Sequence, residues 1–311
     1  MLKNKLLFTV KKEIWEYKNI LFLLPVVLAS LFVMLPIISV VTHDYALDRL
    51  FGMAQHVSSQ ETHSNFGNFY SAAIGFFAIP LMMVSFFVQM FYLISCMYDE
   101  RRDLSIMFWR SMPVADIWQV AMKFLVGVLV IPVIFMLSAT AVYLVFYTIA
   151  LIGSVIFAVG YDISLWHVWF DFGFIKAIAN AFYMILPTVL WLLPLFAWLL
   201  LASAFAKKAP FLWAVLPFVI IVAVEAIAQQ YGFISDMHIF MMVVDYFNLS
   251  ADFNQVNVAT ESAVYSHNGA SVQIDTLPRS LLESKISVPA ILLSGVFFYA
   301  SYWIRANRPM N

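Results

Sequence analysis

The sequence predicts an all-α integral membrane protein with about six transmembrane helices. Of its 311 residues, 63% are hydrophobic and only 11% are charged, whereas a soluble domain is roughly 45–50% apolar and about 25% charged. Six stretches are long and apolar enough to cross roughly 30 Å of hydrocarbon. Basic residues also gather in alternate loops. The predicted spans are approximately 20–42, 69–97, 119–152, 177–206, 211–231 and 286–304.

Proline residues lie inside several of these spans. A proline lacks the backbone N–H that would bond to the carbonyl four residues earlier, so we expect kinks where neighbouring groups satisfy the freed carbonyls. The prolines concerned are Pro25, Pro36, Pro80, Pro132, Pro187, Pro194 and Pro217.

The orientation follows from the positions of Lys and Arg, which favour cytoplasmic loops. Thirteen of the 17 basic residues fall in the N-terminal segment, the loops after the second and fourth spans, and the C-terminal tail. They are Lys3, Lys5, Lys11, Lys12, Lys18, Arg101, Arg102, Arg110, Lys123, Lys207, Lys208, Arg305 and Arg308. Both termini are therefore predicted to be cytoplasmic, which requires an even number of spans.

Three extramembrane segments complete a single transmembrane domain. Apolar residues at three- and four-residue intervals predict an amphipathic helix over 1–19 that lies on the cytoplasmic membrane surface. Residues 153–176, rich in Trp and Asp, are predicted to lie along the opposite interface. The outer region 232–285 contains a half-apolar stretch, 234–247, typical of a re-entrant or interfacial helix. The sequence leaves open whether that region is a lid or a long connection.

Motifs for catalysis, metal binding and nucleic-acid binding are missing. The sequence contains no G-x-x-x-x-G-K-[ST] phosphate loop, no H-E-x-x-H pair and no G-x-S-x-G elbow. The six histidines match no ligand spacing, the single Cys96 is expected to be a small buried apolar residue, and the net charge of −1 gives no attraction to nucleic acid. We therefore predict no catalytic residue, no metal and no cofactor in this chain.

Glu225 is an ionisable residue inside a predicted span. A carboxylate in hydrocarbon costs several kcal/mol unless it is paired or faces water. It is a possible path-lining residue. Alternatively, because it lies about 22 Å from the helix start at Pro210, at 1.5 Å per residue, it reaches headgroup water.

The loop 99–118, between the second and third predicted spans, has the composition of a docking element. Charged residues open it, Asp103 is placed to cap a short helix, and Met112-Pro113 ends that helix. Aromatic and aliphatic residues, including Phe108 and Trp109, supply more apolar surface than a solvated loop needs, which favours insertion into a groove of a partner. The alternative is a loop folded back onto the bilayer.

At this loop the chain resembles the ABC-2 type permeases of ABC exporters. Such loops carry Glu-Arg-x-x-Gly-[Ser/Thr]-Leu, then Pro-[Val/Ile] and a downstream Lys. The matching residues are Glu100, Arg101, Ser105, Ile106, Pro113, Val114 and Lys123, while Leu104 stands where the family has Gly. The resemblance covers the whole chain in architecture and this loop in motif.

The resemblance implies a permease subunit of the plasma membrane, the bacterial inner membrane, that works with an ATP-binding subunit and a second permease, either a copy or a different chain. ATP and magnesium would bind to the partner. The residues expected to contact the ATPase are Glu100, Arg101, Arg102, Phe108, Trp109 and Arg110. Membrane lipids are the other expected partners, and the substrate is not determined.

Two alternatives remain open. A secondary transporter or channel would need no ATPase, and such proteins often have repeated halves and several ionisable residues within the membrane. The other alternative is a membrane enzyme or a non-transporting scaffold. An enzyme would show a cluster of polar catalytic groups near one membrane face, with the outer Asp and His residues as the place to search.

Overall fold

The computed structural model describes residues 10–42, 52, 66–103, 115–161, 173–233, 237–247 and 286–307. Every regular element in these residues is helical, and six helical stretches are long and apolar enough to cross a membrane. The prediction of an all-α membrane protein with six spans is therefore confirmed. The six stretches are Asn19–Ser39, Ala72–Arg102, Asp116–Tyr161, Gly173–Phe205, Pro210–Gln230 and Val288–Asn307.

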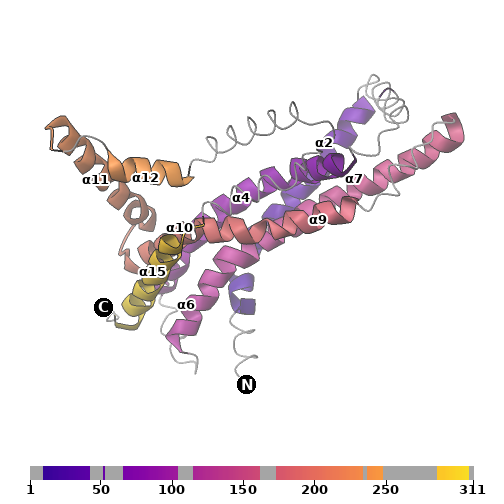
Figure 1. Cartoon of the computed structure of the whole chain (residues 1–311). Coiled ribbons are helices and arrows are strands. Elements are labelled where there is room, and N and C mark those ends of the chain that lie inside the picture. Colours follow the sequence, from indigo (N-terminus) through magenta and orange to yellow (C-terminus); the bar gives the residue numbers. More distant parts are fainter. Residues whose placement is uncertain are drawn as a thin grey trace. The chain divides into compact units, whose positions relative to one another are not determined.

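Figure 1 shows the elements in chain order, from indigo to yellow. The first span consists of a π-helical turn, η1 (Asn19–Leu23), and α2 (Leu24–Thr42). The second is α4 (Phe66–Arg102), and the third is the continuous run of α6 (Asp116–Leu125), η2 (Val126–Val130) and α7 (Ile131–Tyr161). The remaining elements are α9 (Gly173–Tyr183) and α10 (Ile185–Phe205), then α11 (Pro210–Gln230), the short helix α12 (His238–Phe247), and α15 (Val288–Asn307).

The helices extend beyond several predicted limits. Helix α4 continues to Arg102 and α6 begins at Asp116, so the predicted loop 99–118 is shortened from both sides. Helix α7 continues to Tyr161, nine residues past the predicted end, because residues 153–161 are mostly apolar and lack a helix-breaking proline. Hydropathy marks where hydrocarbon ends, whereas backbone hydrogen bonding decides where a helix ends.

Both π-helical turns end two residues before a proline. Turn η1 precedes Pro25 and η2 precedes Pro132. Pro132 has no N–H to donate to the Val128 carbonyl, and Gln89 Nε2 of α4 donates to that oxygen at 3.3 Å. The expectation that a neighbour satisfies a carbonyl freed by proline is confirmed at this position, where a lost bond is costly within hydrocarbon.

The chain forms two compact units, each with its own core. One contains Glu16–Phe87 and Ile131–Ile185, and its core is aromatic. Phe77 stacks on Phe146 with 5.0 Å between ring centroids, and Tyr147 stacks on Phe174 at 4.7 Å. These contacts join α4, α7 and α9.

The other unit contains Met1–Trp15, Val88–Val130 and Leu186–Asn311, and it holds most of the buried charge. Trp198 of α10 donates from Nε1 to the Ala214 carbonyl of α11 and packs edge-on against Phe297 of α15. Cys96 is fully buried, as predicted, and its thiol contacts the Leu93 carbonyl. The rest of this unit positions the site.

Candidate functional site

The N-terminal helical segment, residues 10–16, turns charged side chains toward the protein. Glu13 is 1% exposed; its carboxylate accepts a hydrogen bond from the Tyr92 hydroxyl at 3.0 Å and lies 2.9 Å from Lys123 Nζ. Trp15, in contrast, is 65% exposed. Residues 10–16 of the predicted amphipathic helix 1–19 are therefore a helix whose Glu13 is bonded to Tyr92 of α4 and paired with Lys123 of α6.

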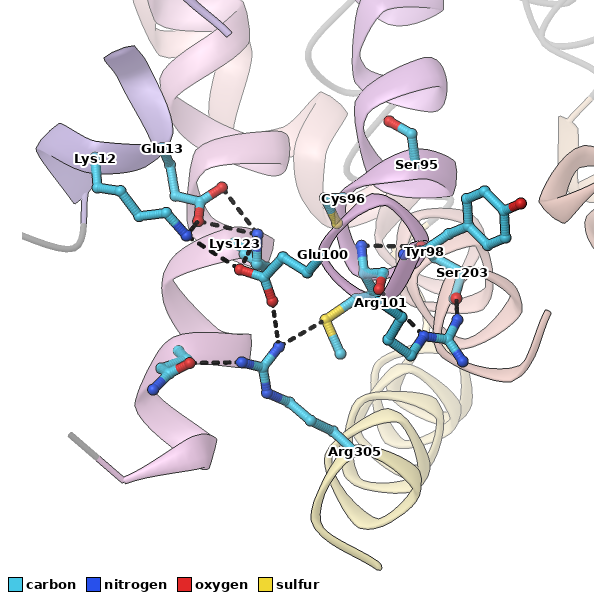
Figure 2. Close-up of polar contacts among 12 residues, drawn as sticks. Lys12, Glu13, Ser95, Cys96, Tyr98, Glu100, Arg101, Lys123, Ser203 and Arg305 are labelled. Carbon is cyan, nitrogen blue, oxygen red and sulfur yellow. Dashed lines mark hydrogen bonds and ion pairs between the residues drawn. The ribbon is translucent and has the colours of Figure 1, made fainter. Parts of the chain in front are cut away.

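Glu100, in the last turn of α4, contacts three cations from three different segments. Its Oε1 lies 3.1 Å from Lys12 Nζ and 3.1 Å from Lys123 Nζ, and its Oε2 lies 2.7 Å from Arg305 Nη1. The residue is 3% exposed. Figure 2 shows these side chains converging from the N-terminal segment, α4, α6 and α15.

Arg305, near the end of α15, reaches α4 and α6 together. Beyond Glu100, its Nη2 donates to Gln119 Oε1 at 2.5 Å, and its Nε lies 3.7 Å from Asp116 Oδ1. Asp116 and Gln119 both belong to the first turns of α6. One guanidinium thus contacts residues on both sides of the segment 104–114.

We refer to Lys12, Glu13, Glu100, Asp116, Lys123 and Arg305 as the charge cluster. It contains three cations and three carboxylates, so the formal charges cancel. Removing a charge from water costs several kcal/mol, and the cost is offset only by close opposite charges and hydrogen bonds. Each cation here has at least two acidic neighbours within 4 Å, so the cluster satisfies that condition. Removing one member would leave another buried and uncompensated.

Arg101 joins the end of α4 to the end of α10. Its guanidinium donates to the carbonyls of Ser203 and Ala206, and Ser203 Oγ accepts from the backbone N–H groups of Met97 and Tyr98. The last carbonyls of a helix have no partner within the helix, and a cation there also interacts favourably with the helix dipole. Arg101 therefore caps the C-terminal end of α10.

The residues expected to contact an ATPase are thus in different environments. Glu100 and Arg101 make contacts within the chain, which gives them a structural role that the sequence did not predict. Arg102 is exposed and pairs with Asp99 at 3.3 Å and Asp103 at 2.9 Å. Phe108, Trp109 and Arg110 lie outside the described residues, so their role stays a prediction.

Glu225 of α11 caps the start of α12. Its two carboxylate oxygens accept hydrogen bonds from the backbone N–H groups of Ile239 and Phe240, at 2.6 and 2.9 Å. The first N–H groups of a helix lack partners within the helix, and a negative charge there is stabilised by the helix dipole. Glu225 is 7% exposed. The sequence had suggested that Glu225 lines a path or reaches headgroup water, and neither interpretation predicted that it caps a helix.

The other end of α12 is attached to α10. Trp191 Nε1 donates to the Tyr246 carbonyl at 3.1 Å, and the Tyr246 hydroxyl donates back to the Trp191 carbonyl at 2.6 Å. Burial raises the pKa of the Tyr246 phenol, which keeps this donor protonated. The helix predicted within 234–247 is confirmed, and α12 is anchored at both ends.

Sequence reasoning missed most of the charge cluster. Lys12 and Arg305 were interpreted as parts of basic segments that set topology, Lys123 was interpreted as a loop residue, and Glu13 was not singled out. A signal was present, because Glu13 is an acidic residue within a lysine-rich segment beside the membrane. Within the described residues, no group of three or more His, Cys, Asp or Glu side chains is arranged to hold a metal ion.

These features define the class of the protein as a multi-pass, all-α integral membrane protein, with charges buried at the junction of several helices. Such an architecture is compatible with a transporter. No protein-family model, curated protein or solved structure matches this chain.

Proposed function

We propose that this chain is the permease subunit of an ATP-binding-cassette exporter, with ATP and magnesium bound by a separate subunit. The observation that carries the proposal is the position of the charge cluster. Glu100 and Asp116 lie near the two ends of the loop 99–118, which was predicted to dock on the ATPase, and they flank its segment 104–114. The cluster connects both ends of this segment to the N-terminal helical segment and to α15.

This arrangement suits the transmission of a force. Breaking a buried ion pair by removing one partner costs about 3–5 kcal/mol, so the four segments joined by the cluster are expected to move together. A pull on segment 104–114 would then displace the ends of α4, α6 and α15 as one body. If the loop were joined to the helices only by flexible chain, the loop would move and the helices would not follow.

The apolar surface of several helices is exposed and must be covered in the membrane. Helices α2, α11 and α15 expose many large apolar side chains along their length, which lipid or another subunit must cover in a membrane. The surface does not distinguish a second copy of this chain from a different permease. Outward transport and the presence of a second permease subunit rest on the resemblance to the family.

The proposal is tested by coexpressing the tagged chain with the ATP-binding subunits of its own cell and purifying it in a mild detergent. A chain carrying a phosphate loop should copurify and should hydrolyse ATP faster in the complex than alone. The variants Arg102→Glu and Trp109→Ala should release that chain without changing the melting temperature of the permease. Charge reversal at Arg101 is unsuitable, because it would also break the contacts that cap α10.

The control is Lys176→Gln, an exposed basic residue of α9, in the unit that does not contain the charge cluster. It should retain the ATPase. If the wild-type chain purifies without a phosphate-loop protein, under conditions that keep other membrane complexes intact, the permease assignment is wrong. A secondary transporter or a membrane enzyme would then be the next hypothesis.

A further inference from the structure

We infer that Arg305 is a positioning residue that fixes the first turn of α6 to the last turn of α4, and so connects the motion of segment 104–114 to α15. The inference rests on the proposed function in one respect, namely that an ATPase moves the segment 104–114. The role of Arg305 in holding the ends of α4 and α6 together rests on the geometry of the described residues.

Among the described residues, the N-cap residue of α6 provides no side-chain cap. Ala115 occupies the N-cap position and makes no side-chain hydrogen bond to the helix, whereas Ser, Thr, Asp or Asn at this position would satisfy one of the free N–H groups. The start of α6 is therefore more dependent on tertiary contacts than a capped helix would be. Arg305 does not act as a cap, because a guanidinium has only donors. It holds the first turns of the helix through the side chains of Asp116 and Gln119.

Within the described residues, the two lysines of the cluster pair with Glu13 and Glu100. Lys123 also belongs to α6, but it lies seven residues beyond Asp116, and its Nζ contacts Glu13 and Glu100. Lys12 contacts Glu13 and Glu100. In the described part of the chain, the ion pairs and hydrogen bonds of Arg305 join Glu100 to the first turns of α6.

An arginine is required by the shape of the site. The planar guanidinium directs separate N–H groups at separate acceptors, whereas a lysine presents one compact ammonium on a shorter reach. Nη1 donates a hydrogen bond to Glu100 and Nη2 donates one to Gln119, while Nε lies 3.7 Å from Asp116 Oδ1. Lysine at position 305 would keep the charge but lose the simultaneous contact with α4 and α6.

The structural part is tested by measuring the separation of the two helix ends. Asp103 and Ala115 are both exposed and flank the undescribed segment, so each is replaced by cysteine in a Cys96→Ala background and carries a spin label. Pulsed EPR in nanodiscs should give a narrow distance distribution with Arg305. It should be broader in Arg305→Lys and in Gln119→Leu, and unchanged in Lys176→Gln. An unchanged distribution in both Arg305→Lys and Gln119→Leu would overturn the inference.

The functional part is tested in the complex with the ATPase. Arg305→Lys should retain the ATPase, but the stimulation of hydrolysis by the permease should fall about fivefold or more, the lower range for loss of coupling between two sites. Release of the ATPase by this variant would instead make Arg305 a docking residue and overturn the inference. Failure of the wild-type chain to bind an ATPase is a separate result, because it refutes the proposed function whatever the spin labels show.

Discussion

Lys123 and Glu13 form an ion pair in which Nζ and Oε1 are 2.9 Å apart, although 110 residues separate them in the chain. Both residues are 1% exposed. Lys123 lies on α6, and Glu13 lies in the helical segment that precedes the first span. The pair therefore attaches the N-terminal segment to the third span through charge, within a protein whose helices pack mostly through apolar contacts.

Replacing Lys123 with methionine should destabilise the protein by about 3–5 kcal/mol, because Glu13 and Glu100 would lose a shared buried cation. The melting temperature can be followed with a thiol-reactive dye, because Cys96 is the one cysteine of the chain and is fully buried until the protein unfolds. Lys18→Met removes an exposed lysine of the same N-terminal region and should have little effect. Equal melting temperatures for the two variants would contradict the role of the cluster.

Gln89→Leu should destabilise the protein by about 1–3 kcal/mol, the cost of removing a partner from a buried polar group. Gln89 supplies the donor that Pro132 cannot give to the Val128 carbonyl. A second substitution, Pro132→Ala, restores a backbone N–H at that point. In the same thermal assay the double variant should lose less stability than the sum of the two single variants. Simple additivity would show that Gln89 does not compensate for the proline.

Gly127→Ala should destabilise the protein by about 1–3 kcal/mol, as expected when a packed core is overfilled. A Cβ at Gly127 would lie 2.6 Å from Leu93 Cδ2 and 2.9 Å from Leu93 Cγ, and Leu93 is fully buried. Gly153 on α7 has no atom within 4 Å of the corresponding position. Gly153→Ala should therefore be neutral or slightly stabilising, because alanine is the better helix former. Similar losses in the two variants would rule out close contact as the cause.

Glu225→Ala should loosen α12 locally, by about 0.5–2 kcal/mol, the range observed when a helix cap is removed. Glu225→Gln keeps an acceptor without the charge and should lie between the wild type and Glu225→Ala. Hydrogen exchange measured by mass spectrometry should show faster exchange in residues 238–247 and little change in α4 or α6. Gln230→Ala, at an exposed position near the end of α11, serves as the control. Unaltered exchange in α12 would show that the cap contributes little.

The sequence predicted the spans well because each is a local property. A run of about 20 apolar residues is specified by bilayer thickness, and it is visible without knowing what the run packs against. A half-apolar stretch within 234–247 likewise indicated a short helix, which is α12. Helix limits were less accurate, as at Arg102 and Tyr161, where backbone hydrogen bonding continues past the hydrophobic run.

The sequence alone thus determined that this is a membrane protein with six spans, and it drew attention to the segment between α4 and α6. Only the tertiary structure decided that Glu100 and Arg101 face other helices, that Glu225 caps α12, and that Arg305 meets Glu100 across 205 residues. The physical reason is that hydrophobicity is read residue by residue, whereas a buried charge is tolerated only beside a partner. Helix packing, and not sequence distance, brings that partner within reach.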